Sequence, residues 1–219
     1  MSGVAATLLI LNPNSSTVVT NRLAEEAKRV APLNITVRAV TNPAGPIGIQ
    51  TLEELNAARE WVLATIAANI NCVAAVIGAF GDPGLDEARA QSPIRVVGLG
   101  EAGILAAAEG GRRFSIVTAG VAMRAAVLDK IESLDVREQL ASLRYLPHTV
   151  IDVVRDRERV LADAVDIISA CFKEDGAAAV LLGGAPFAGT AHTLALQSTV
   201  PVIDGAEAAI RSAIAGLDW

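Results

Sequence analysis

The chain has 219 residues, of which 52% are hydrophobic and 3% are aromatic, and its formal net charge is −6. This length suffices for one large domain or two small ones, and an Ala/Val/Leu/Ile-rich core favours strands covered by helices over an aromatic-rich β-sandwich. The negative charge and the lack of a Lys/Arg run exclude the clustered cations that bind phosphates, so no nucleic-acid partner is expected.

The first half of the chain alternates short apolar runs with longer stretches of helical spacing. Strands are predicted at residues 6–12, 35–40, 73–80 and 94–100, and helices at 15–31, 51–70 and 101–110. The first residues carry no cationic segment, so we interpret the apolar part of residues 1–16 as a strand and not as a secretory leader. No apolar run approaches the roughly 18 residues that span a bilayer. We therefore expect a soluble cytoplasmic protein with no membrane association.

The same alternation starts again after residue 112. Strands are predicted at 113–120, 142–148, 177–184 and 200–204, and helices at 121–134, 155–176 and 205–217. Continuous apolar strands separated by helices are typical of mostly parallel sheets with helices on both faces. The predicted fold class is therefore α/β.

The two halves keep nearly the same spacing. The strand end at Asn12 matches the one at Thr118, 106 residues later, and the strand end at Ala79 matches the one at Gly184, 105 residues later. Chance similarity of apolar strands is the alternative to a duplication. We predict two similar lobes related by a pseudo-twofold axis, made of residues 1–98 with 204–219 and of residues 99–203. Ligands of α/β sheets bind beyond the carboxyl ends of strands, so the predicted cleft lies between the lobes.

Six stretches resemble the aspartate/glutamate/hydantoin racemase superfamily, and most closely its hydantoin and allantoin racemase branch. They occur in the family's order and extend over almost the whole chain: LNPNSS (11–16), GPIGIQT (45–51), FGDPGLDEAR (80–89), VVGLGEAG (96–103), RFSIVT (113–118) and LLGGAPFAG (181–189). The most specific of them is FGDPGL directly after an apolar strand.

The resemblance implies a reaction for which this sequence lacks the reacting groups. Such racemases use two cysteines, one at the end of each of two strands: one thiolate removes the α-proton, and the opposite thiol returns a proton to the other face. The matching positions here are Ala79 and Gly184, whose side chains hold no transferable proton. Cys72 lies seven positions before Ala79, roughly 23 Å along an extended strand, and Cys171 is interpreted as a buried structural residue. Two-thiol racemisation is therefore excluded for this chain.

Three interpretations stay open: a natural branch that changed the reaction, a hydantoin/allantoin-type racemase present as a cysteine-replaced inactive variant, and a non-catalytic small-molecule binding protein. Ala79 with Gly184 is an unusual engineered pair, and Gln50 stands where Glu is more usual in the family. Both observations favour the first interpretation. It predicts an enzyme that acts on a small cyclic amide or imide, such as a hydantoin, or on a short carboxylic acid, by a cysteine-independent hydrolytic or lyase-type step.

The candidate substrate-binding residues lie at the strand tips and in the two glycine-rich turns: Asn12, Ser15, Gln50, Ala79, Phe80, Gly81, Thr118, Gly184, Ala185 and Phe187. Backbone N–H groups of such turns bind carboxylates, imide oxygens and developing oxyanions. Ser16 is interpreted as a helix cap, and Asp82 as the residue that fixes its turn. His192 is the candidate catalytic base because imidazole titrates near neutral pH, with a solvent-facing helix position as the alternative.

Neither a metal nor a cofactor is expected. The sequence contains no His/Cys/Asp cluster with ligand spacing, and GLGEAG (98–103) lacks the spacing and the downstream acid of a dinucleotide loop. A small-molecule substrate is the expected partner, and the resemblance implies a homo-oligomer.

Overall fold

The computed structural model describes residues 6–217. Residues 1–5 and 218–219, which are predicted to belong to the first lobe, lie outside the described residues. The start of residues 1–16, whose apolar part is interpreted as a strand and not as a secretory leader, therefore lies outside them too. The first four strands form one parallel sheet in the order β2-β1-β3-β4. Their bounds are β1 (Ala6–Asn12), β2 (Ile35–Thr41), β3 (Ala74–Ile77) and β4 (Arg95–Gly98).

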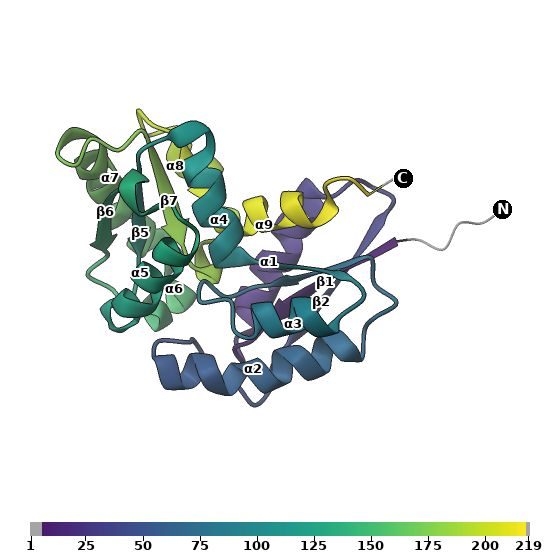
Figure 1. Cartoon of the computed structure of the whole chain (residues 1–219). Coiled ribbons are helices and arrows are strands. Elements are labelled where there is room, and N and C mark those ends of the chain that lie inside the picture. Colours follow the sequence, from purple (N-terminus) through teal and green to yellow (C-terminus); the bar gives the residue numbers. More distant parts are fainter. Residues whose placement is uncertain (1–5, 218–219) are drawn as a thin grey trace.

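The next four strands form a second parallel sheet in the order β6-β5-β7-β8. Their bounds are β5 (Phe114–Thr118), β6 (Leu140–Tyr145), β7 (Ala179–Gly183) and β8 (Val202–Asp204). The two sheets therefore have the same strand order: β5, β6, β7 and β8 take the places of β1, β2, β3 and β4. The predicted α/β fold of two similar lobes is confirmed. The two sheets lie side by side in Figure 1.

Helices cover both faces of the first sheet. On one face, α1 (Thr17–Val30) and α9 (Gly205–Ile214) pack on Leu8 and Ile10 of β1. On the other face, α2 (Leu52–Ala67) and α3 (Leu85–Gln91) pack on the alternate residues of the same strand. Because both faces are buried, residues 8–11 of β1 are all apolar instead of alternating with polar ones.

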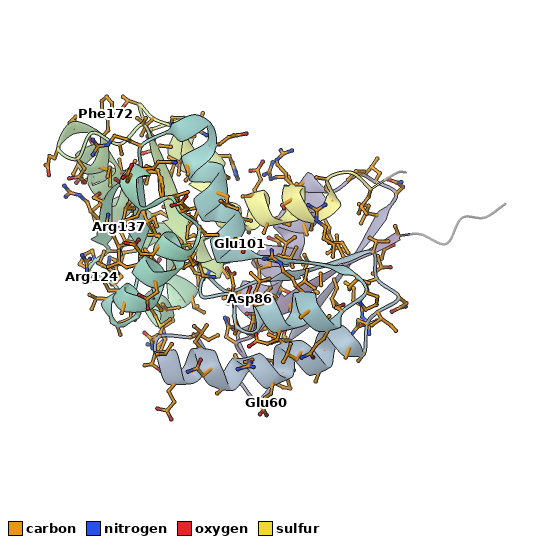
Figure 2. All side chains as sticks on the ribbon, in the orientation of Figure 1. Glu60, Asp86, Glu101, Arg124, Arg137 and Phe172 are labelled. Carbon is orange, nitrogen blue, oxygen red and sulfur yellow. The ribbon has the colours of Figure 1, made fainter. Side chains whose placement is uncertain are left out.

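The second sheet is covered in the same way. One face holds α6 (Val150–Arg155), α7 (Arg157–Lys173) and α8 (Ala191–Ala195). The other face holds α4 (Leu99–Ala108) and α5 (Arg124–Ser133). Short 3-10 turns complete the described elements: η1 (Glu109–Gly111), η2 (Val121–Met123), η3 (Arg137–Gln139) and η4 (Ala185–Phe187). Charged side chains such as Glu60 and Arg137 lie on the outside of this framework (Figure 2).

Local chemistry sets two boundaries that differ from the prediction. The strand predicted at 73–80 ends at Ile77, because the chain bends at Ala79 into the turn in which the N–H of Asp82 donates to the carbonyl of Ala79. The helix predicted at 155–176 begins at Arg157 as α7, and a short helix that was not predicted, α6, precedes it. Asp156 lies between them in a non-helical conformation, and its carboxylate accepts the N–H of Arg159 to begin α7.

Among residues 6–217, no helix has the length and apolar character needed to cross a bilayer.

Candidate active site

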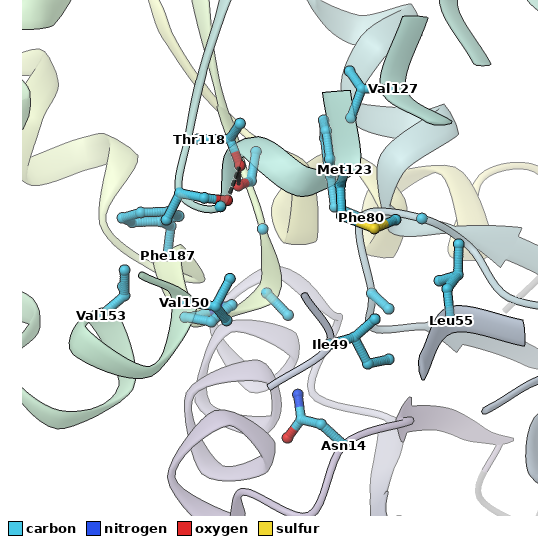
Figure 3. Close-up of a pocket in the computed structure, with 18 of the residues that line it drawn as sticks. Asn14, Ile49, Leu55, Phe80, Thr118, Met123, Val127, Val150, Val153 and Phe187 are labelled. Carbon is cyan, nitrogen blue, oxygen red and sulfur yellow. Dashed lines mark hydrogen bonds between the residues drawn. The ribbon is translucent and has the colours of Figure 1, made fainter. Parts of the chain in front are cut away.

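A pocket opens at the carboxyl ends of the central strands of both sheets (Figure 3). The space between these strand ends, including the part that is open to solvent, amounts to about 840 Å³. Seven of the predicted substrate-binding residues line it: Ala79, Phe80, Gly81, Thr118, Gly184, Ala185 and Phe187. The two strand ends that match the superfamily's cysteine positions therefore belong to one pocket.

Four predicted residues do not line the pocket. His192, the candidate base, is exposed on α8. Ser15 donates its backbone N–H to Pro46, and Gln50 donates its own to Glu54 next to the capping box of α2. Asn12 is fully buried behind the pocket. None of these four residues lines the pocket in this structure, so no direct contact supports the roles predicted for them.

The turn after β3 is held by its own backbone and by Asp82. The N–H of Asp82 donates to the carbonyl of Ala79 at 3.0 Å, and Asp82 itself has a left-handed φ of 50°. The described hydrogen bonds give no protein acceptor to the N–H groups of Phe80 and Gly81. These two donors at the pocket wall are therefore open to a ligand oxygen.

The turn after β7 repeats this arrangement. The N–H of Phe187 donates to the carbonyl of Gly184 at 3.0 Å, and the hydroxyl of Thr118 donates to the carbonyl of Gly183 at 2.6 Å (dashed in Figure 3). The N–H groups of Gly184 and Ala185 also have no protein acceptor among the described hydrogen bonds. Unpaired donors thus come from both lobes.

The two turns touch across the lobes. A Cβ at Gly183 would lie 2.9 Å from Cζ of Phe80, so the Phe80 ring of the first lobe packs directly on the backbone of β7. Only glycine leaves room for this ring. Both residues line the pocket, so the two lobes are in contact at its wall.

Asn14 is a pocket residue that the sequence analysis missed. Its Oδ1 accepts the Nδ2 of Asn12 and the N–H of Ser16, each at 2.9 Å. These two donors fix the orientation of the amide and leave its Nδ2 facing the pocket (Figure 3). Asn12, predicted as a ligand, instead positions Asn14. The LNPNSS motif pointed to this segment but could not distinguish its two asparagines.

Lys130 is the second residue that the sequence analysis missed. It lies on α5, lines the pocket, and donates from its ammonium group to Oδ2 of Asp82. The Asp82 carboxylate also accepts the N–H groups of Gly100 and Glu101 at the start of α4, at 2.8 Å each. Burial raises the pKa of Asp82, against the opposing effects of Lys130 and the two N–H donors. No motif signals Lys130, because the pairing joins two lobes.

The two cysteines lie outside the pocket lining, and both are buried free thiols. Cys72 precedes β3 at its amino end, and Cys171 lies on α7. Burial raises the pKa of each thiol, so neither is a reactive thiolate. Among residues 6–217, no group of three or more His, Cys, Asp or Glu side chains is placed to hold a metal ion.

Comparisons with known proteins agree with this geometry. A model of the Asp/Glu/hydantoin racemase family matches residues 8–213. The hydantoin racemase of Paenarthrobacter aurescens is 31% identical over 209 residues, which covers 94% of this chain and 89% of the relative. A Pseudomonas hydantoin racemase is 30% identical over 206 residues, with 93% and 83% covered. The solved allantoin racemase from Klebsiella pneumoniae has a TM-score of 0.90 at 28% identity, and the match covers 95% of this chain and 86% of that one.

Proposed function

Because this chain belongs to the Asp/Glu/hydantoin racemase family, in its hydantoin branch, we propose that it is an enzyme that acts on a small cyclic amide or imide, or on a short carboxylic acid, in the pocket between its two sheets. The step uses no cysteine and is hydrolytic or of the lyase type. One observation carries the proposal: Ala79 and Gly184 line one pocket, and the turns that follow them contain N–H groups without a protein acceptor among the described hydrogen bonds.

Both reaction types place negative charge on an oxygen. In hydrolysis, water adds to the amide carbon, the carbonyl electrons move to oxygen, and the C–N bond breaks as nitrogen takes a proton. In a lyase step, a C–C bond breaks and one fragment leaves as carbon dioxide or a carbonyl compound. The electron pair of the bond moves into a carbonyl or carboxylate next to the remaining carbon, until that carbon takes a proton from water. The N–H groups of Phe80, Gly81, Gly184 and Ala185 would stabilise that oxygen. One such donor is worth roughly 10²–10³-fold in rate.

The backbone at Gly184 disfavours the alternative of a racemase with replaced cysteines. Gly184 has φ 137° and ψ 139°, a conformation that L-residues rarely adopt. A cysteine would find space there, since the nearest atom to a built Cβ is 3.5 Å away, but not a suitable backbone. The turn is therefore shaped for glycine.

A substrate screen tests the proposal. The protein is incubated with 5-substituted hydantoins, cyclic imides and short carboxylic acids, and mass spectrometry records the gain of water or the loss of a fragment. We expect a mass change with at least one class. The rate should fall at least tenfold in Asn14→Ala, which removes a pocket donor, and stay unchanged in Asn21→Ala, an exposed asparagine of α1.

Two results would contradict the proposal. Incubation of hydantoins in heavy water reports exchange of the α-proton, and rapid exchange with stereoinversion would mean that the chain is a racemase despite its lack of thiols at 79 and 184. Binding without any mass change would favour a non-catalytic binding protein.

The cytoplasmic location and the homo-oligomeric state expected from the sequence belong to the same proposal. The family resemblance supports the oligomeric state, and the location rests on the sequence features given above. Light scattering after size exclusion measures the assembly, and a mass equal to the 22.6 kDa of one chain would refute it.

A further inference from the structure

We infer that Lys130 is the anion-binding residue of the pocket, and that the ligand is an organic acid with an apolar substituent, bound through its carboxylate. This inference rests on the proposed function. Of the two substrate classes proposed there, it selects the carboxylic acid over the neutral cyclic amide or imide.

Lys130 supplies the pocket's charge. Among the described residues that line the pocket, it is the only one with an ionisable side chain. Its side chain is 18% exposed, so the ammonium group is shielded from solvent but accessible from the pocket. A shielded charge acts on a ligand more strongly than an exposed one, because fewer water dipoles screen it.

Asp82 holds Lys130 without cancelling its effect on the pocket. The carboxylate has 0% side-chain exposure and does not line the pocket, whereas Lys130 does. Its negative charge is further balanced by the N–H groups of Gly100 and Glu101 at the start of the ten-residue helix α4. A ligand in the pocket therefore meets the cation first.

The donors beside Lys130 match a carboxylate. Asp82 directly follows Gly81, so the ammonium lies at the same turn that presents the unpaired N–H groups of Phe80 and Gly81. The described hydrogen bonds use one N–H of the ammonium, which leaves two for a ligand. A carboxylate offers two charged oxygens with about four acceptor sites, whereas the carbonyl oxygens of an amide, imide or hydantoin are neutral. Charge-assisted bonds to a carboxylate are also roughly twice as strong as neutral ones.

Apart from Asn14 and Thr118, the other side chains that line the pocket are apolar. Ile49, Leu55, Met123 and Val127 line it on one side, where Figure 3 places them around the side chain of Phe80. A small, fully polar acid would leave these side chains without contacts. The arrangement therefore fits an acid whose carboxylate meets Lys130 and whose branched or aromatic substituent meets this apolar wall.

Calorimetry with an isosteric pair tests the inference. The probes are 4-methylpentanoate and its neutral amide, 4-methylpentanamide, and 5-isobutylhydantoin represents the other substrate class. We expect the acid to bind the wild-type protein at least tenfold more tightly than either neutral probe. The double variant Asp82→Asn/Lys130→Met removes both charges of the pair and should abolish this preference. Lys173→Met, a change at an exposed lysine of α7, should leave it intact.

Circular dichroism first establishes that the double variant is folded. If the double variant is unfolded, the test uses the wild-type protein and Lys130→Arg, which keeps the positive charge. Both should bind the acid at least tenfold more tightly than the amide. Equal binding of acid and amide, no acid binding at millimolar concentrations, or a preference that survives loss of Lys130 would overturn the inference. Product formation without acid preference would refute this inference alone, and acid preference without product formation would refute only the proposed function.

Discussion

Single residues in the two turns are restricted by backbone geometry as well as by contacts. At Gly183 a Cβ would lie only 2.9 Å from the Phe80 ring. At Gly184 the nearest atom to a Cβ would be 3.5 Å away, but the backbone has an unusual φ of 137°. Asn12 and Asn14 share one hydrogen-bond network although only Asn14 lines the pocket. Neighbouring positions thus serve different purposes, which a motif read from the sequence does not separate.

Gly184→Ala should destabilise the protein by about 2 kcal/mol, because the backbone must hold an L-residue in a rarely populated region or move the turn. Gly110→Ala is the matched control: its φ of 69° is ordinary left-handed helical, and nothing lies within 4 Å of a built Cβ. There we expect a loss of about 1 kcal/mol. Urea unfolding measures both. A Gly184→Ala variant as stable as wild type would mean that this turn adopts a negative φ.

Asn12→Ala should weaken ligand binding although Asn12 does not line the pocket. The change removes an amide that donates to Asn14, Ser16 and Thr20 within 3.0 Å, and it frees the orientation of the Asn14 side chain. We expect the free energy of unfolding to fall by about 2 kcal/mol, since buried groups lose their partners. Calorimetry with 4-methylpentanoate measures the affinity. Unchanged affinity in the folded variant would limit Asn12 to a structural role.

At the scale of elements, the sequence predicts the parallel strands well because each is a short apolar run between helical stretches. Ser16 caps α1, as predicted, with its side chain accepting the N–H of Val19. The errors lie where side chains break a regular pattern, as Asp156 does between α6 and α7. Such a break depends on which carboxylate turns back to its own backbone, and periodicity carries no signal for it.

The cap of α9 predicts a pH dependence. Asp204 accepts the N–H groups of Ala206 and Gly189, and burial, together with the nearby Glu26 carboxylate, raises its pKa from 3.8 to about 6. The folded state therefore binds this proton more tightly than the unfolded state. It follows that the contribution of Asp204 to the free energy of unfolding falls as the pH rises from about 4 to about 6, by up to about 3 kcal/mol.

Asp204→Asn keeps an acceptor for the cap and removes the titration. Carboxylates with lowered pKa, such as Glu101 and Asp175, produce the opposite trend, so the difference between wild type and variant is the quantity to measure. Urea unfolding of both proteins between pH 4 and pH 7 should give a difference that changes across this range in favour of the variant. A difference independent of pH would place the pKa of Asp204 at its ordinary value.

At the scale of the whole molecule, the near-constant spacing of strand ends predicts two similar lobes and their shared pocket. It does not predict which groups join the lobes. The pairing of Lys130 with Asp82 and the packing of Phe80 on Gly183 each connect residues far apart in the chain. These contacts depend on how one lobe is placed against the other, which strand and helix patterns do not encode. The division at residues 98/99 and 203/204 stays a prediction.

Arg22 makes the strongest testable connection between the lobes. From α1 it donates to the carbonyls of Val153 and Pro186, each at 3.1 Å, and both of those residues line the pocket. Burial lowers the pKa of its guanidinium to about 10, which leaves it protonated at neutral pH. Arg22→Met would leave buried carbonyls without donors and should reduce the free energy of unfolding by about 2–3 kcal/mol.

The same change should weaken ligand binding, because α6 and η4 form one wall of the pocket and would no longer be tied to α1. Arg159→Met, at an exposed position of α7, is the control and should stay within about 0.5 kcal/mol of wild type. Urea unfolding and calorimetry with 4-methylpentanoate measure the two effects. A stability loss with full affinity would show that the wall keeps its place without Arg22, held by the other contacts between the lobes.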